Sequence, residues 1–249
     1  DAALYETVKA VGLELCPALG ISIPVGKDSL SMRTQWREGD QPKQVTSPVS
    51  LIVTAFATLD DVRATLTPQL HAKEPSALIL VDLGRTRQRM AGSILAQTLG
   101  QMGDEVPDLD DPQDLVRLVQ AVNALRAKGQ ILAYHDRSDG GLFATACEMA
   151  FAGHVGVSLN VDVLVTEGDG ISDSRMDVGD GRNWTSQVGG RRDELTLKAL
   201  FNEELGVLLQ VRAVERDAVL QTLRAHGLGA CSHAVGSTRP ADSVIQVGV

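Results

Sequence analysis

A short polar turn between a strand-like and a helix-like segment is the feature that most constrains the fold of this chain. Residues 131–134 (Ile-Leu-Ala-Tyr) are apolar and few enough for a buried strand, and apolar residues recur at helical spacing from 142 to 152. The turn that joins them, residues 135–141, has the sequence His-Asp-Arg-Ser-Asp-Gly-Gly. The sequence therefore predicts a strand, a polar turn and a helix N-terminus in direct succession.

The composition of this turn suggests a site for a metal-bound nucleotide. A helix N-terminus exposes backbone N–H groups without a helical partner, and its dipole attracts anions. The carboxylates of Asp136 and Asp139 would repel a bare phosphate. They would accept a phosphate that carries a divalent cation, because hard cations take carboxylate oxygens as ligands. The amides of Gly140 and Gly141 would then hold phosphate oxygens together with Ser138.

The same residues also suit a purely structural helix cap. Ser138 or Asp139 is a good N-cap residue, and the two glycines tolerate unusual backbone angles. Short glycine-rich motifs have a high false-positive rate, so the turn alone favours the capping interpretation. The rest of the chain has to decide between the two.

Composition restricts the class of protein. The chain has 249 residues, 43% of them hydrophobic, a formal net charge of −9 and a pI near 5.0. Such a chain buries a substantial core and is not expected to be disordered. Nucleic-acid binding is not expected, because that function needs a positive surface to displace counterions. No apolar run of 18 residues suggests a membrane span.

The cysteines indicate the redox state of the compartment in which the protein folds. Cys16, Cys147 and Cys231 are odd in number and widely spaced, so neither a disulfide framework nor a zinc site is indicated. With no signal-peptide pattern, we expect a reducing, cytoplasmic location.

The chain begins at Asp1 within a helical pattern, and we expect it to be a piece of a longer protein.

The N-terminal part is predicted to be the end of a larger α/β domain. A helix over 1–19 is expected to end at Pro17 and Gly20. Two strands joined by a tight turn should follow, at 21–25 and 30–36. A polar loop is predicted at 37–44, and a central strand buried on both faces at 49–57. The pattern breaks between 58 and 75, and we place a domain boundary there, giving domains 1–62 and 63–249.

The second part mixes strands and helices in the pattern of an α/β sandwich. Strands are predicted at 77–83, 131–134, 155–163, 206–212, 232–236 and 244–247. Helices are predicted at 90–102, 111–128, 142–152, 195–204 and 215–226. Residues 166–192 lack apolar periodicity and are predicted to be a flexible insertion.

Two long motifs resemble those of the large, multidomain formylglycinamide ribonucleotide amidotransferases. They are Ile-Pro-Val-Gly-Lys-Asp-Ser-Leu-Ser-Met at 23–32 and Ala-Tyr-His-Asp-Arg-Ser-Asp-Gly-Gly-Leu-Phe at 133–143. Three shorter segments agree: Thr-Pro-Gln-Leu at 67–70, Pro-Asp-Leu-Asp-Asp at 107–111 and Phe-Asn-Glu-Glu-Leu-Gly at 201–206. The chain is similar to the second of two synthetase halves in that family. The resemblance implies the end of a synthetase N-terminal domain and then a C-terminal domain of the aminoimidazole ribonucleotide synthetase type.

The resemblance also implies a reaction. Members of the family use ATP to activate the amide oxygen of formylglycinamide ribonucleotide, and ammonia from glutamine then displaces phosphate to give the amidine. The expected products are formylglycinamidine ribonucleotide, ADP, phosphate and glutamate, and the expected cofactors are ATP or ADP and Mg²⁺. The expected partners are the substrate and, in the same polypeptide, the other synthetase half and a glutaminase domain. No catalytic residue is assigned within this chain.

Functional residues carry over from the family one by one. The aspartate that binds nucleotide-bound magnesium corresponds to Asp136, and the serine that contacts the nucleotide corresponds to Ser138. Lys27, Asp28 and Ser29 correspond to a loop that contacts phosphate and metal in related synthetases, although Lys-Asp here replaces Gly-Asn. We assign nucleotide binding to Lys27 and Ser29 and metal binding to Asp28, with a tight turn held by its own side chains as the alternative.

Other polar residues have weaker cases. His135 is interpreted as a packed residue at a strand end, and Glu203 as a capping residue or a neighbour of the site. Arg85, Arg87 and Arg89 form a basic turn that either meets substrate phosphate or is simply solvated.

Two alternative functions remain open. In the first, this half of the enzyme holds a structural Mg-nucleotide without turning it over. In the second, the chain comes from an aminoimidazole ribonucleotide synthetase-like enzyme. The Gly-Lys-Asp-Ser turn at 26–29 and the segment 202–206 argue against the latter.

Overall fold

The computed structural model describes residues 2–27, 29, 32–166 and 184–248, and these residues form two compact units. The first unit runs from Asp1 to Val62 and the second from Arg63 to Val249. None of the helices in the described residues is long and apolar enough to cross a membrane.

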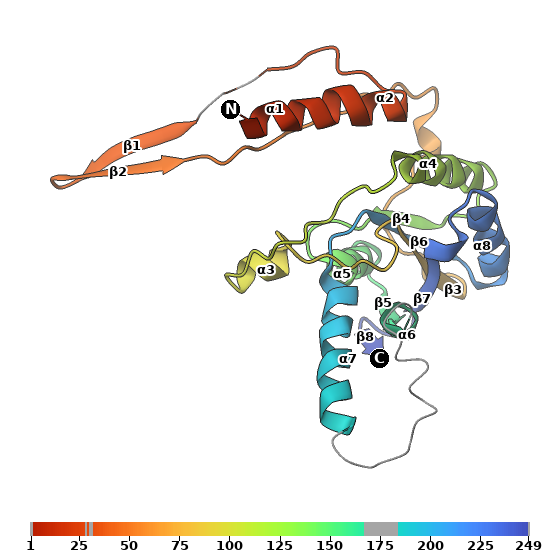
Figure 1. Cartoon of the computed structure of the whole chain (residues 1–249). Coiled ribbons are helices and arrows are strands. Elements are labelled where there is room, and N and C mark those ends of the chain that lie inside the picture. The colour runs from red at the N-terminus through yellow and green to blue at the C-terminus, as the bar shows by residue number, and fades with distance from the viewer. Residues whose placement is uncertain (1, 28, 30–31, 167–183, 249) are drawn as a thin grey trace. The chain divides into compact units, whose positions relative to one another are not determined.

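The first unit contains one interrupted helix and one hairpin (Figure 1). The helix begins as α1 (Ala2–Lys9), continues through the π-helical segment η1 (Ala10–Leu15) and finishes as α2 (Cys16–Leu19). Gly20 ends it with a φ of 70°, so the helix finishes at Leu19 as predicted, and Pro17 lies inside its last segment.

The strands of the first unit differ from those expected. Strands β1 (Arg33–Glu38) and β2 (Gln41–Thr46) pair antiparallel around a turn at Gly39, so the predicted polar loop 37–44 is largely a hairpin. Residues 21–25 form no strand, and neither do residues 49–57, where Ile52 and Phe56 are more than 90% exposed. A central strand that is buried on both faces needs a neighbouring strand on each side. The described part of this unit contains only the two-stranded sheet of β1 and β2.

The second unit is built on a six-stranded sheet with the strand order β4-β6-β3-β7-β5-β8. All neighbours are antiparallel except β5 and β8, which are parallel. The strands are β3 (Ser76–Asp82), β4 (Ala133–Asp136), β5 (Gly156–Asn160), β6 (Gly206–Arg212), β7 (Ser232–Arg239) and β8 (Ile245–Gly248). The helices are η2 (Val62–Ala64), α3 (Ile94–Thr98), α4 (Pro112–Ala127), α5 (Gly141–Gly153), α6 (Asp162–Thr166), α7 (Trp184–Phe201), η4 (Ala213–Glu215), α8 (Arg216–Ala225) and η5 (Gly229–Cys231).

Helices cover both faces of this sheet, so the predicted α/β sandwich is confirmed (Figure 1). Strand β3 is buried throughout because its side chains alternate between two cores. Leu78 and Leu80 pack in the core that contains residues of α5, α6 and α7, and Ile79 and Val81 pack in the core that contains residues of α4 and α8. Each core holds apolar side chains with almost no exposure, which supplies the main driving force for folding.

Two predicted segments of the second unit need correction. The helix expected over 90–102 is only α3, with Ser93 as its N-cap: the Ser93 side chain accepts a hydrogen bond from the Ala96 N–H at 3.2 Å. Part of the predicted flexible insertion, residues 184–192, belongs to α7, and residues 167–183 lie outside the described residues.

The side chain of Gln210 holds the segment around His71, which precedes strand β3, against the sheet. This side chain is fully buried in β6, and its Nε2 donates to the His71 carbonyl at 2.7 Å and to the Ser76 hydroxyl at 2.9 Å. Its Oε1 accepts the His71 N–H at 2.8 Å. The amide therefore pairs with the His71 backbone as a neighbouring strand would.

We expect Gln210→Met to lower the free energy of unfolding by about 2–4 kcal/mol, because both polar groups of the His71 backbone lose their partner. The exposed Gln120→Met on α4 is the matched control and should change it by less than about 0.5 kcal/mol. Urea unfolding followed by circular dichroism measures both, and equal midpoints for the two variants would contradict the role of Gln210.

Candidate functional site

The predicted polar turn follows directly from the end of the edge strand β4. Asp136 is the last residue of that strand and is exposed, Arg137 is buried, and Ser138 is exposed again. Residues two apart along an extended chain point to the same side. The fold thus presents Asp136 and Ser138 to solvent and draws the residue between them into the protein.

Arg137 anchors the turn to two other segments. Its Nη2 donates to Asp82 Oδ1 at 2.5 Å and to the Leu205 carbonyl at 3.2 Å, and its Nε donates to the Glu204 carbonyl at 2.6 Å. Its backbone N–H donates to the Gly206 carbonyl at 2.8 Å. A buried charge needs this degree of pairing, because removing one partner of such a pair costs several kcal/mol.

Carboxylates at Asp82 and Glu204 extend this network to the loop after β3. Asp82 accepts the N–H groups of Gly84 and Thr86 at 3.2 and 3.1 Å. The fully buried Glu204 accepts the backbone N–H, Nε and Nη2 of Arg89 at 3.0, 2.7 and 2.8 Å. These hydrogen bonds raise the pKa of the Arg89 guanidinium further above its usual value.

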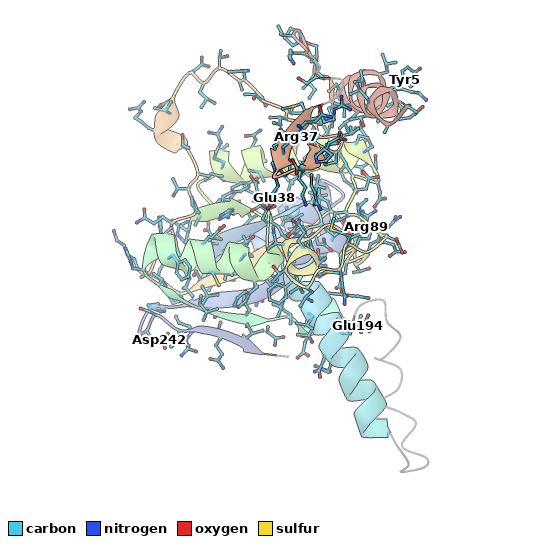
Figure 2. All side chains as sticks on the ribbon, turned by 90° about the vertical axis from the view of Figure 1, so that its left-hand side faces the viewer. Tyr5, Arg37, Glu38, Arg89, Glu194 and Asp242 are labelled. Atoms are coloured by element: carbon cyan, nitrogen blue, oxygen red, sulfur yellow. The ribbon has the colours of Figure 1, made fainter. Side chains whose placement is uncertain are left out.

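The basic turn 84–89 is therefore engaged in ion pairs. Arg85 binds Asp114 at 2.8 Å, and Arg87 binds Asp110 at 3.0 Å. Arg89, labelled in Figure 2, pairs with both Glu204 and Asp110. The hydrogen bond from Arg85 holds the pKa of the Asp114 carboxyl below its usual value. Each of the three arginines considered for substrate phosphate already has a carboxylate partner.

Tyr134 orients the carboxylate of Asp136. The two residues are two positions apart on β4, and the Tyr134 hydroxyl donates to Asp136 Oδ1 at 2.6 Å. Burial, followed by the nearby carboxylate, raises the pKa of Tyr134 above its usual value, so the phenol keeps its proton. The other carboxylate oxygen has no hydrogen-bond partner among the described residues. Sequence reasoning missed Tyr134, although its spacing from Asp136 in a strand was the available signal.

His135 lies on the opposite side of the strand. Its Nδ1 is 2.8 Å from the Asp136 carbonyl oxygen, and its Nε2 is 2.9 Å from Glu148 Oε2 on α5. Both ring nitrogens are thus committed to neighbours, as expected for a packed residue at a strand end.

The glycine amides of the turn have partners within the fold. The Gly140 N–H donates to Glu203 Oε1 at 2.8 Å, and the Gly141 N–H donates to the Ser138 carbonyl at 2.9 Å. The same oxygen of Glu203 accepts the Ile94 N–H at 2.9 Å. Glu203 therefore places a carboxylate at the N-terminus of α5, where the helix dipole favours negative charge.

Both glycines are also required by the backbone. Gly140 is the N-cap of α5 with a φ of 82°, and Gly141 has a φ of 67°. A Cβ on Gly141 would lie 2.6 Å from the Asn202 carbonyl oxygen and 2.7 Å from that of Leu200. These neighbours are backbone atoms and have no rotamer that would relieve the clash.

The second group of candidates belongs to the first unit. Lys27 and Ser29 are both exposed, and the Lys27 ammonium donates to the Ser29 hydroxyl. Asp28 lies outside the described residues. No strand directly flanks this turn among the described residues, so its surroundings are not those of a tight hairpin.

The exposed Asp136 suits a magnesium ion that arrives with a nucleotide. The described residues contain no group of three His, Cys, Asp or Glu side chains able to hold a metal by themselves. Magnesium in nucleotide sites keeps several waters and takes one or two carboxylates in addition to phosphate oxygens. A single carboxylate with one free oxygen, next to an exposed serine hydroxyl, fits that donor set.

Comparison with known families covers most of the chain. Residues 1–58 match the family model described as the FGAR-AT PurM_N-like domain. Residues 76–247 match the model described as AIR synthase related protein, C-terminal domain. Two adjoining parts of the chain thus match two domain models in succession.

Solved structures are similar to this chain at low sequence identity. T. maritima PurL complexed with ATP is 13% identical with a TM-score of 0.50, covering 75% of this chain and 25% of that chain. PurLQS from Thermotoga maritima is 14% identical with a TM-score of 0.47, and the match covers 72% of this chain and 24% of that chain. E. coli HypE, a hydrogenase maturation protein, is 19% identical with a TM-score of 0.46, and the match covers 74% of this chain and 49% of that chain. The chain spans about a quarter of the length of the Thermotoga chains.

We expect Gly141→Ala to lower the free energy of unfolding by about 3 kcal/mol or more, because it combines a left-handed backbone with a clash against backbone atoms. Gly129→Ala is the matched control, since Gly129 has a φ of 63° and open space around its Cβ position. It should cost about 1–2 kcal/mol. Similar losses in the two variants, measured by urea unfolding, would show that the close approach at Gly141 is unimportant.

Proposed function

The chain belongs to the AIR synthase related protein family, and we propose that it is the second synthetase-like half of a phosphoribosylformylglycinamidine synthase. The complete enzyme would be an ATP-dependent ligase in the cytoplasm. It would convert formylglycinamide ribonucleotide, glutamine and ATP to formylglycinamidine ribonucleotide, ADP, phosphate and glutamate. The succession of the FGAR-AT match at 1–58 and the AIR synthase match at 76–247 carries this proposal.

In this proposal Asp136 and Ser138 form the nucleotide-facing part of the second unit. The free oxygen of Asp136 would bind nucleotide-bound Mg²⁺, which neutralises phosphate charge during phosphoryl transfer. The Ser138 hydroxyl, which has no hydrogen-bond partner among the described residues, would donate to a phosphate oxygen. Both side chains are exposed and flank the buried Arg137, which supports a common ligand.

The backbone N–H groups of Gly140 and Gly141 would bind phosphate oxygens by exchanging their present hydrogen-bond acceptors for them. A phosphate oxygen would replace the Glu203 carboxylate on the Gly140 N–H, since both are anions at the same helix N-terminus. Gly141 would contribute its N–H after release from the Ser138 carbonyl. Lys27 and Ser29 remain candidates for nucleotide contacts, and Asp28 for a metal contact, by the resemblance alone.

A second candidate function is a half that holds a structural Mg-nucleotide. This alternative is favoured by the kind of residues in the turn, because Asp136 and Ser138 would hold a nucleotide and no catalytic residue is assigned in the chain. Nucleotide that co-purifies with the protein and does not exchange with labelled ATP would support the structural role.

We expect Asp136→Ala to weaken the binding of Mg·ATP to the full-length enzyme by about tenfold or more, the effect of losing one good charge contact. Asp139→Ala is the matched control, because Asp139 is an exposed carboxylate in the same turn without a hydrogen bond to any described residue. Isothermal titration after removal of bound nucleotide measures both. Unchanged affinity in Asp136→Ala would reject the assignment.

Tyr134→Phe tests whether the orientation of Asp136 matters for metal binding. The variant removes only the hydroxyl that holds Asp136 Oδ1, and loss of such an outer contact typically weakens metal binding by about 10–100-fold. The Mg²⁺ concentration needed for half-maximal nucleotide binding should rise accordingly. If that concentration is unchanged, the hydrogen bond has no role in positioning the carboxylate.

A further inference from the structure

The segment between β3 and α4 carries a group of exposed apolar side chains. We call its residues 90–106, which include α3, the α3 loop, and this loop projects away from the six-stranded sheet (Figure 1). The apolar side chains that are 42–64% exposed there are Ile94, Leu99, Met102 and Val106. Single exposed apolar residues are normal on a protein surface, but four of them within thirteen residues are typical of an interaction surface.

The backbone of the α3 loop is fixed, although its side chains are exposed. Its two arms are joined by hydrogen bonds from the Ala91 N–H to the Glu105 carbonyl and from the Gly92 N–H to the Met102 carbonyl, both at 2.8 Å. The buried Ser93 side chain caps α3. A surface that is already held in one conformation loses little entropy when it binds a partner. The apolar side chains of the α3 loop are therefore presented in a form suited to docking.

Two carboxylates among these apolar side chains indicate the charge of the partner. Asp104 and Glu105 are exposed, and neither side chain has an ion pair or a hydrogen bond among the described residues. The α3 loop contains no lysine or arginine. By contrast, Asp110 and Asp111, a few residues further on, are paired with arginines of the same unit. A partner with basic side chains would complement Asp104 and Glu105.

A second copy of the chain does not match this surface. In a two-fold dimer the same patch meets itself, so Asp104 and Glu105 would face the like charges of the other copy. The net charge of −9 on each chain adds to the repulsion between copies. The partner is therefore a different surface, apolar at its centre and basic at its edge.

We propose that the α3 loop docks against an amphipathic surface, rich in lysine or arginine, on another domain of the full-length protein. The inference rests on the proposed function, because it places the partner in the remainder of that multidomain enzyme. Leu99 and Met102 lie at the apolar centre of the contact, and Asp104 and Glu105 pair with basic side chains at its edge. The apolar contact supplies most of the affinity, and the charge pairs supply the orientation.

Site-specific photo-crosslinking in the full-length protein identifies the partner surface. Leu99, which is 64% exposed, is replaced by p-benzoylphenylalanine, and mass spectrometry identifies the crosslinked peptides. We expect the main crosslink to join Leu99 to a peptide that contains lysine or arginine and lies outside residues 1–249. Crosslinks confined to residues 1–249, crosslinks between the α3 loops of two copies, or the absence of any crosslink would each overturn the proposal.

The variant Met102→Cys measures in the full-length protein whether the α3 loop is covered. We expect the added changes Asp104→Lys and Glu105→Lys to raise the reaction rate of this thiol with N-ethylmaleimide by about tenfold or more, because reversed charges weaken docking by about 1.4 kcal/mol or more. Dividing each rate by that of the same variant in urea removes the direct effect of the new lysines on the thiol. Gln120→Cys on α4 is the matched control, and the same charge reversal should leave its rate unchanged.

The outcomes separate this proposal from the proposed function. An unchanged rate for Met102→Cys, or an equal rise for Gln120→Cys, would overturn the docking of the α3 loop. If Asp136→Ala leaves Mg·ATP binding unchanged while Met102→Cys behaves as expected, only the proposed function fails. If Asp136→Ala weakens that binding while the rate for Met102→Cys is unchanged, only the docking proposal fails.

Discussion

The buried guanidinium of Arg137 is the interaction on which the candidate site depends. It joins the turn after β4 to Asp82 at the end of β3 and to the carbonyls that precede β6. Those three strands are neighbours in the sheet, so one side chain fixes the ends of all three. The adjoining Glu204 adds the loop 84–89 through Arg89. Because Arg137 is held so firmly, the backbone of Asp136 and Ser138 on either side of it has a defined position, and the Tyr134 hydroxyl then orients the Asp136 carboxylate.

The functional and structural interpretations of this turn apply to different atoms. The glycines satisfy backbone requirements: Gly140 and Gly141 have positive φ, and Gly141 has no room for a side chain. Their N–H groups are used by Glu203 and Ser138. The exposed side chains of Asp136 and Ser138 contribute little to this cap, which leaves them available for a ligand. A glycine-rich turn of this kind is thus both a helix cap and a support for exposed polar side chains.

Local sequence patterns predicted the second unit better than the first. Helix α4 begins at Asp111, whose side chain caps it by accepting the Gln113 N–H, and β6 has the predicted bounds, because capping and apolar runs are local signals. Segment 49–57 has the composition of a buried strand, but the described part of its unit provides no neighbours to pair with it. Asp136 and Ser138 stay candidates from their motif, and the structure shows them exposed, whereas the burial of Arg137 depends on Asp82, 55 positions away. Long-range ion pairs of this type leave no local pattern in a sequence.

The edge position of β4 explains why Asp136 is exposed while Tyr134, two positions earlier, is partly buried. An edge strand has a neighbour on one side only, and here the Tyr134 N–H on the outer side is taken by the Thr67 carbonyl at 2.9 Å. Side chains at the end of such a strand can face solvent while those before them contact the helix layer. Tyr134 and Asp136, two positions apart on β4, are about 7 Å apart along the extended backbone. The Tyr134 hydroxyl therefore reaches the Asp136 carboxylate along the strand and holds it at the exposed end of the sheet edge.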